Sequence, residues 1–423
     1  MEREYKDSGI EWIGLIPKEW NKDKVNRIFS TIGSGTTPSS SDEKAYEGTL
    51  NWIQSGDING GDLLDVKNKI SETTLQKYSA LTMYYAPFII IAMYGASVGN
   101  ISISYINGCV NQACCVLADP IHYFKYQFYA IKSAKDYLIF KAVGGGQPNI
   151  SQATLKQLWL PFPPLFEQQK IADYLDKVCG EADEMIALQE KMIEELKAYK
   201  QSVITEAVTK GLNPNVPMKD SGIDWIGEIP EHWEICRFKD IAKVKANLVH
   251  PDDYYDYPQI APDNIEKGSG RLLPYKSVKE ANVISDNHLF FRGQIIYSKI
   301  RPVLNKLIIA PFDGLCSADM YPIETTNDIN YLKYYMLSEV FVSQVALVVQ
   351  DRVKMPKINK DELGVIYVLS LPMDEQRQIA SFLDLKCSDI DSLIAVKQQK
   401  IEELKEYKKS VIYEYVTGKK EVI

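Results

Sequence analysis

Residues 167–211 read EQQKIADYLDKVCGEADEMIALQEKMIEELKAYKQSVITEAVTKG, and residues 375–419 read EQRQIASFLDLKCSDIDSLIAVKQQKIEELKEYKKSVIYEYVTGK. The two stretches align without a gap at an offset of 208, and 23 of 45 positions are identical. Neither contains proline, and apolar residues recur at steps of three and four, which predicts two amphipathic helices of roughly 60 Å each. The stripe residues are Leu175, Met185, Leu196, Val203, Leu383, Ile394, Leu404 and Val411. We expect the helices to pack on one another as an antiparallel coiled coil, because rods of this length extend beyond a domain of about 140 residues.

A second repeat precedes each half of the chain. Residues 6–20 read KDSGIEWIGLIPKEW and residues 219–233 read KDSGIDWIGEIPEHW, with 11 of 15 positions identical at an offset of 213. We call each copy an opener. Because both halves share it, its tryptophans, Trp12, Trp20, Trp225 and Trp233, are expected to pack in the core or against the helices.

The segments between opener and helix differ in sequence but share a scaffold. Both are rich in β-branched and aromatic residues with glycine-containing turns, which favours mixed, mostly-β domains. Residues 89–103 superpose on 295–309 as a strand, loop and strand, and 147–155 on 355–363. The sequence therefore predicts an α+β protein with a pseudo-twofold internal duplication. Two mixed mostly-β domains, 1–166 and 213–374, are separated by long antiparallel coiled-coil helices, 167–212 and 375–423.

Composition restricts the class of protein. The chain has 423 residues, 45% of them hydrophobic, and a net charge of -8, so it is long enough for two or three ordered domains. Its seven cysteines follow no regular spacing and the start of the chain has no apolar signal segment, which predicts reduced thiols in a cytoplasmic protein. The longest apolar run, near residues 88–93, is far too short to cross a membrane.

The negative charge is unevenly distributed. Residues 21–160 hold 12 Lys and Arg against 10 Asp and Glu, and residues 234–371 hold 17 against 17. The helix at 167–211 holds 6 against 10, and residues 372–423 hold 9 against 10. A net-acidic chain lacks the usual basic footprint of a DNA-binding protein. Near-neutral domains still bind DNA where their basic residues converge on one face.

No catalytic motif is evident in the sequence. A phosphate-binding loop of the GxxxxGK[ST] type and a strand-following GxGxxG are both absent. Histidines and cysteines lack metal-ligand spacing, and the adjacent Cys114 and Cys115 follow the pattern of buried thiols. Glu195-Leu196-Lys197 lies mid-helix, where pairing between residues one turn apart explains its charges. We expect no active site in this chain.

The duplicated series of motifs resembles the specificity subunit of type I restriction-modification enzymes. The motifs are the opener, GSGTTP (33–38), WIQSGDI (52–58), YGASVG (94–99), GQPNIS (146–151) and LPFPPLFEQQKIADYLD (160–176), followed by GQIIYSKIRP (293–302) and LPMDEQRQIASFLD (371–384). They cover nearly the whole chain in the order of that family.

This resemblance implies the function and the partners. Each mostly-β domain would be a target-recognition domain that reads one half of a bipartite site in double-stranded DNA. The conserved helices would hold the halves apart and dock two modification (methyltransferase) subunits, and restriction (endonuclease and translocase) subunits would complete the complex. The specificity subunit itself would carry no catalytic group and no cofactor. S-adenosylmethionine would sit in the modification subunit, and ATP and Mg²⁺ in the restriction subunit.

Candidate DNA contacts come from loops on the shared scaffold. Arg and Lys recognise guanine, and Asn and Gln recognise adenine, by paired hydrogen bonds. In the second domain the candidates are Lys299, Arg301, Lys306, Arg352, Lys354 and Lys357. In the first domain they are Tyr94, Asn100, Gln147 and Asn149, with Ser34 and Thr36 as phosphate donors. A solvated charge cluster is the alternative for the basic residues, and a mobile loop is the alternative for Ser34 and Thr36.

Two other functions remain open at the level of sequence. One is a specificity subunit of a type IIB-like system, which only the partner genes distinguish from type I. The other is a coiled-coil scaffold whose β domains bind protein. The scaffold predicts no salt-dependent affinity for DNA, even with a methyltransferase present.

Overall fold

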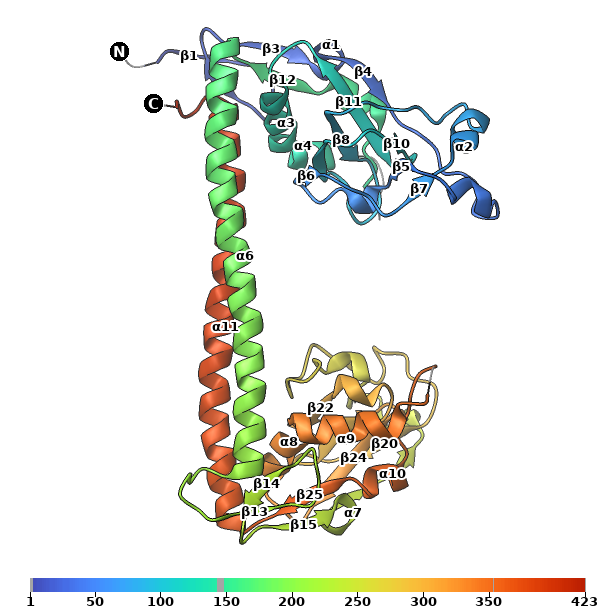
Figure 1. The fold of residues 1–423 in the computed structure, drawn as a ribbon, viewed down its shortest axis with the longest axis vertical. Helices are drawn as coiled ribbons and strands as arrows, with labels where there is room; N and C mark the ends of the chain where they lie inside the picture. The colour runs from blue at the N-terminus through green and yellow to red at the C-terminus, as the bar shows by residue number, and fades with distance from the viewer. Residues whose placement is uncertain (1–2, 143–147, 353, 423) are drawn as a thin grey trace. The chain divides into compact units, whose positions relative to one another are not determined.

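The computed structural model describes residues 3–142, 148–352 and 354–422. The chain forms two compact units, the first comprising Met1–Leu188 with Lys400–Ile423 and the second Gln189–Gln399. Each unit therefore contains one mostly-β region and parts of both long helices (Figure 1). The boundaries expected from the repeats differ from this division, because they assigned each helix to a segment of its own.

The two long helices are α6 (Leu165–Lys210) and α11 (Met373–Val416). Each begins two residues before the start of the repeat, after a proline, and each ends at a left-handed glycine, Gly211 or Gly418. In the first unit the start of α6 packs on the end of α11, with the Tyr174 and Tyr415 ring centroids 4.5 Å apart. In the second unit the end of α6 packs on the start of α11, where Lys200 binds Asp391. The helices are thus antiparallel in both units.

The expected apolar stripe is only partly buried. Leu175, Leu383, Leu404 and Val411 are at most 9% exposed, while Leu196, Val203 and Ile394 are half-buried. Met185 is 54% exposed, so the coiled-coil part of its prediction is wrong, while a role in subunit docking stays a prediction. The step from Ala182 to Met185 leaves the packed face, which continues through Ile186 and Ile193.

The first unit is built around a five-stranded sheet of order β4-β11-β8-β9-β6. Its strands are β1 (Tyr5–Asp7), β2 (Leu15–Pro17), β3 (Asn21–Lys24), β4 (Phe29–Gly33), β5 (Leu50–Ile53), β6 (Asp62–Leu63), β7 (Lys69–Ile70), β8 (Phe88–Ala92), β9 (Ile101–Ser104), β10 (Cys109–Val110), β11 (Cys114–Pro120) and β12 (Trp159–Phe162). Its short helices are α1 (Val25–Ile28), η1 (Glu43–Tyr46), η2 (Ser55–Asp57), α2 (Glu72–Lys77), α3 (Phe124–Ser133), α4 (Lys135–Phe140) and α5 (Gln152–Gln157). A smaller sheet, β10-β5-β7, adjoins the main one.

The second unit repeats this plan with a four-stranded sheet of order β16-β24-β21-β22 and a five-stranded sheet of order β17-β20-β23-β18-β19. Its strands are β13 (Met218–Asp220), β14 (Glu228–Pro230), β15 (Glu234–Arg237), β16 (Ala242–Val244), β17 (Leu248–Val249), β18 (Pro258–Ile260), β19 (Lys276–Ser277), β20 (Asn287–Phe290), β21 (Ile295–Ser298), β22 (Leu307–Ile309), β23 (Gly314–Cys316), β24 (Met320–Thr325) and β25 (Tyr367–Ser370). Its short helices are α7 (Phe238–Ile241), η3 (Pro251–Tyr254), η4 (Pro262–Asn264), η5 (Pro302–Leu304), α8 (Ile329–Leu337), α9 (Glu339–Val349) and α10 (Lys360–Gly364). The predicted duplication of the scaffold is confirmed, because β8 and β9 correspond to β21 and β22.

Each opener joins its unit to both long helices through one buried tryptophan. The Trp20 indole nitrogen donates to Glu167 at the start of α6 (2.8 Å), and a Cβ on Gly418, after α11, would lie 3.1 Å from the ring. Trp233 likewise donates to Glu375 at the start of α11 (2.9 Å), and a Cβ on Gly211, after α6, would lie 3.2 Å from its ring. Both tryptophans are fully buried, as expected for core residues.

The other two opener tryptophans differ from that expectation in degree. Trp12 is half-buried, with its ring centroid 6.3 Å from that of Tyr137. Trp225 is 44% exposed, so it is not a core residue, and of the two predicted placements only packing against a helix stays a prediction. In the second unit its ring lies at the wall of a cavity instead.

The cysteines are thiols rather than disulfides, and most of them are buried. All seven cysteines are free, and burial raises the pKa of the Cys114 and Cys115 thiols to about 12. In the described part of the chain, no single helix has the length and apolar character needed to cross a membrane. The bent pair α8 and α9 passes that test jointly, and most of its apolar side chains belong to the core of the second unit.

Candidate nucleic-acid interface

Three loops of the first unit meet at one edge of its main sheet. Because β8 and β11 are antiparallel neighbours, the end of β8 and the start of β11 lie at the same edge. There the Met93 amide donates to the Ala113 carbonyl (2.7 Å), and the Ile150 amide donates to the Met93 carbonyl (2.8 Å). We call residues 93–100, 111–113 and 148–151 the first junction.

The second unit forms the same junction with the same backbone bonds. The Lys299 amide donates to the Asp319 carbonyl (3.0 Å), and the Ile358 amide donates to the Lys299 carbonyl (2.9 Å). Residues 299–306, 317–319 and 354–358 are the second junction. Main-chain bonds hold both sets of loops, and main-chain bonds make no demand on the identity of the side chain.

The side chains at equivalent positions of the two junctions differ in charge. Lys299 and Lys357 replace Met93 and Asn149, and Asp319 replaces Ala113. The Lys357 ammonium binds the Asp319 carboxylate (3.1 Å), and the Lys299 ammonium lies 5.3 Å from the centre of the Tyr321 ring. The second junction is therefore a charged surface built on the backbone that carries an almost neutral surface in the first unit.

The first loop of each junction, 93–100 or 299–306, has left-handed residues at the same two positions. Gly95 and Gly99 have φ of +85° and +76°, and the equivalent Arg301 and Asn305 have φ of +44° and +46°. The Asn305 side chain is buried and donates to the Met336 carbonyl (2.8 Å). Arg301 is exposed.

Two residues predicted to contact DNA, Asn100 and Lys306, point inward instead. The structure corrects the sequence prediction for both. Asn100 Nδ2 donates to the Ile58 carbonyl (3.1 Å), and Lys135 donates to Asn100 Oδ1 (2.8 Å). At the equivalent position Lys306 donates to the Pro262 carbonyl (2.7 Å), and its side chain is only 18% exposed. Both side chains tie the loop to a 3-10 turn, because the left-handed residue before each directs the chain inward.

The two remaining basic candidates near the second junction, Arg352 and Lys354, differ in their pairing. Arg352 forms an ion pair with Glu362, which raises the pKa of Arg352 and lowers that of Glu362. This pairing makes Arg352 a support for the loop rather than an available cation. Lys354 is exposed and, within the described part of the chain, its ammonium forms no ion pair.

The candidate DNA-binding residues of the first unit are divided between the first junction and an adjoining loop. Asn149 is exposed at the junction, whereas Tyr94 is half-buried, and burial raises its pKa. Ser34 and Thr36 lie on the adjoining loop, where their carbonyls accept from Tyr84 (3.0 Å) and Trp52 (3.3 Å). Gln147 lies outside the described residues.

Two junction residues were missed by the sequence reasoning. Gln112 is exposed and accepts from Thr37 Oγ1 (2.5 Å), which connects the loop at 34–37 to the first junction. Asp319 occupies the corresponding segment of the second unit. Asp319 lies directly before β24, and Gln112 lies two residues before β11. Neither strand is part of the aligned segments, so no sequence signal marked either residue.

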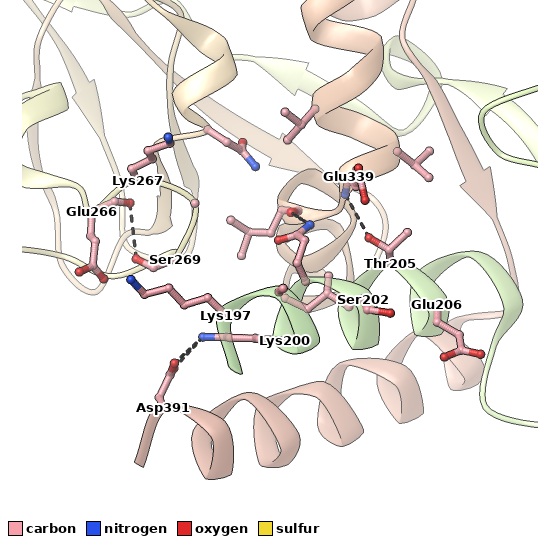
Figure 2. Close-up of a pocket in the computed structure, with 18 of the residues that line it drawn as sticks. Lys197, Lys200, Ser202, Thr205, Glu206, Glu266, Lys267, Ser269, Glu339 and Asp391 are labelled. Atoms are coloured by element: carbon pink, nitrogen blue, oxygen red, sulfur yellow. Dashed lines mark hydrogen bonds and ion pairs between the residues drawn. The ribbon is translucent and has the colours of Figure 1, made fainter. Parts of the chain in front are cut away.

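A cavity of about 1320 Å³ lies in the second unit, between the α6 segment, the loop at 266–271, η5 and the start of α9 (Figure 2). Some of its charged groups pair with one another, as Lys200 does with Asp391 (2.7 Å) and Arg271 with Glu266 (3.3 Å). The back of the second junction, at Leu304 and Asn305, forms part of its wall. Within the described ranges, no group of three or more His, Cys, Asp or Glu is arranged to hold a metal ion.

The fold and the junctions together define an internally duplicated protein, in which two related modules carry different loops on one backbone frame. Comparison with known families agrees with this class. Residues 17–198 and 230–406 match the family described as the type I restriction modification DNA specificity domain. These ranges cover most of the chain, and the chain belongs to this family.

Individual relatives show the extent of the likeness. The chain is 34% identical over 251 residues to the type I restriction enzyme EcoDI specificity subunit of Escherichia coli, an alignment that spans 56% of each chain. It is 25% identical over 318 residues to the MjaVIII specificity subunit of Methanocaldococcus jannaschii, covering 70% of this chain and 69% of that one. A solved chain from work on assembly and conformational transition of the type I restriction-modification system shares the fold. Its TM-score is 0.70 at 12% identity, covering 95% of this chain and 98% of that chain.

Proposed function

We propose that this chain is the DNA sequence-recognition subunit of a type I restriction-modification complex. Each unit binds one half of a bipartite site in double-stranded DNA through its junction. The observation that carries the proposal is the shared backbone of the two junctions, in which Lys299 and Asp319 replace Met93 and Ala113. Two modules that bind different base sequences in one orientation need such a frame, because phosphate contacts position a protein while base contacts specify the sequence.

In this account the subunit works in the cytoplasm and binds rather than catalyses. Two methyltransferase subunits dock on the conserved helices, where the exposed apolar residues Met185, Leu188, Leu393 and Val396 give them a surface. Restriction subunits complete the assembly. S-adenosylmethionine belongs to the methyltransferase subunits, and ATP and Mg²⁺ belong to the restriction subunits.

The two mostly-β segments have little or no net positive charge, which agrees with a subunit that needs its partners to bind DNA tightly. The two mostly-β segments carry 12 against 10 and 17 against 17 basic and acidic residues. Counterion release therefore provides only modest affinity to the chain alone. We expect tight, salt-dependent and sequence-specific binding only in complex with the methyltransferase.

Deletion of the gene tests the proposal. The expected result is the loss of one bipartite methylation motif from the genome, mapped by single-molecule sequencing, and its return with the gene on a plasmid. An unchanged methylome in a strain whose methyltransferase is active would refute the proposal. Absence of salt-dependent DNA binding by the reconstituted complex would favour a protein-binding scaffold instead.

A further inference from the structure

Arg301 occupies a backbone conformation that is unfavourable for an arginine. Its φ and ψ are +44° and +53°, in the left-handed region that glycine adopts freely and other residues rarely adopt. The equivalent residue of the first unit is Gly95, with φ of +85°. The same turn is therefore built with glycine in one unit and with arginine in the other.

No contact within the protein accounts for the arginine. Asn305, the other left-handed residue of the loop, is buried and bonded to the Met336 carbonyl. Arg301 is exposed and, among the residues that the structure describes, its guanidinium forms no hydrogen bond or ion pair. Strain that the fold does not need is a reason to look for a function.

The backbone around Arg301 is held firmly. Its amide donates to the Pro356 carbonyl (2.7 Å), and its own carbonyl accepts from the Leu304 amide (2.9 Å). Pro302, which follows, is buried, and Ile300 bridges to Lys357. The backbone of Arg301 is thus fixed before binding, so that only the side chain loses conformational entropy when the guanidinium binds.

Two exposed cations of the second junction, Lys354 and Arg301, suit different parts of DNA. Lys354 is an exposed cation one loop away from Arg301, and flexible lysines suit the phosphate backbone. A planar guanidinium on a fixed backbone suits a target with two acceptors in fixed geometry. In the major groove, guanine offers that pair as O6 and N7.

We infer that Arg301 reads a guanine in the half-site bound by the second unit, by donating two hydrogen bonds to O6 and N7. The first unit has Gly95 there and contacts its half-site without an arginine at this position. This inference rests on the proposed function and adds to it one base, one residue and one half-site.

The test uses the complex reconstituted with its methyltransferase subunits and DNA that carries the mapped motif. Arg301→Gly should weaken binding to the cognate site by about 10- to 100-fold and leave binding to unrelated DNA within about threefold. Replacing a single guanine of the second half-site by 7-deazaguanine, which lacks the N7 acceptor, should weaken the wild-type complex and cause no further loss for Arg301→Gly. Arg292→Ala is the matched control, because Arg292 is also exposed but lies before the other end of β21. Its binding to both DNAs should be unchanged.

Two further readouts make the outcome decisive. The thermal midpoint of Arg301→Gly should be equal to or above that of the wild type, because glycine removes the strain. Arg301→Lys, which keeps the charge but lacks the planar fork of donors, should keep the salt dependence and only part of the preference for guanine. Equal loss on all DNA, insensitivity to 7-deazaguanine at every guanine, or a second half-site without guanine overturns the inference. A wild-type complex without any sequence preference refutes the proposed function instead.

Discussion

The first and second units differ where their loops meet and agree where they hold the long helices. Trp20 and Trp233 make the same bond to a helix-terminal glutamate, and Gln168 and Gln376 each accept from one backbone amide and donate to a proline or leucine carbonyl. At the junctions, by contrast, the side chains of the first unit are neutral, whereas several of those at the equivalent positions of the second unit are charged. Specific side chains therefore fix the contacts with the long helices, whereas mainly backbone bonds fix the loops, so that the exposed side chains of the loops are free to vary.

The largest expected loss of stability comes from the tryptophans that contact the long helices in the same way in both units. Trp20→Ala and Trp233→Ala each remove a fully buried ring that contacts the ends of both helices. Each should destabilise its unit by about 3–5 kcal/mol, measured by denaturant unfolding. Trp225→Ala is the control, because that ring is 44% exposed and should cost much less. A large difference between Trp20→Ala and Trp233→Ala would break the equivalence of the two units.

The next effect tests the left-handed turn that the units share. A Cβ added at Gly95 meets no atom within 4 Å, so Gly95→Ala changes only the backbone preference. It should destabilise the first unit by about 1 kcal/mol, and Arg301→Gly should stabilise the second by a similar amount. Thermal unfolding measures both. Two changes of the same sign would contradict the account of strain.

A smaller effect concerns the ion pair that each unit forms between α6 and α11. Lys408 binds Asp183 in the first unit, and Lys200 binds Asp391 in the second, at an offset of 208. Because both carboxylates are more than half exposed, Asp183→Asn and Asp391→Asn should each cost less than about 1 kcal/mol. Urea unfolding in low and high salt checks this. An effect above that in one unit only would show that the helix contacts are not equivalent.

The smallest effect is a pH dependence of the second unit, at His288 in β20. Burial lowers the pKa of His288, and the charge of Lys299 lowers it further. A histidine with a depressed folded-state pKa stabilises the fold above about pH 6.5 and loses that contribution as the pH falls below it. Lys299→Met, which restores the first-unit residue, should raise the pKa of His288 in an NMR titration. His122 of the first unit is the internal reference and should not shift.

Much of the fold was predictable because repetition is visible in the sequence. The identities at an offset of 208 located both helices, and the aligned strand pairs located the junction loops. The exposure of Met185 was not predictable, since steps of three and four residues define a stripe but not which edge of it faces the partner helix. The outcome for Trp225 depended on a cavity that its sequence copy, Trp12, does not reveal.

The candidate interface was predictable by region but not by residue. Lys306 and Asn100 aligned within the correct loop, yet their side chains turn inward after the left-handed positions Asn305 and Gly99. Arg352 is paired with a glutamate ten residues away, and that contact depends on how the loop folds back on α10. Asp319 was missed because one residue before a strand gives no signal until the sheet order is known.

An exchange of residues 21–166 for the same segment of another family member tests the central claim most directly. The chimera would be expressed with the methyltransferase subunits, and its methylated motif mapped by single-molecule sequencing. The account predicts that one half of the bipartite motif changes, while the other half and the spacer length stay as in the parent. A methylating chimera in which both halves change, or neither does, would contradict it.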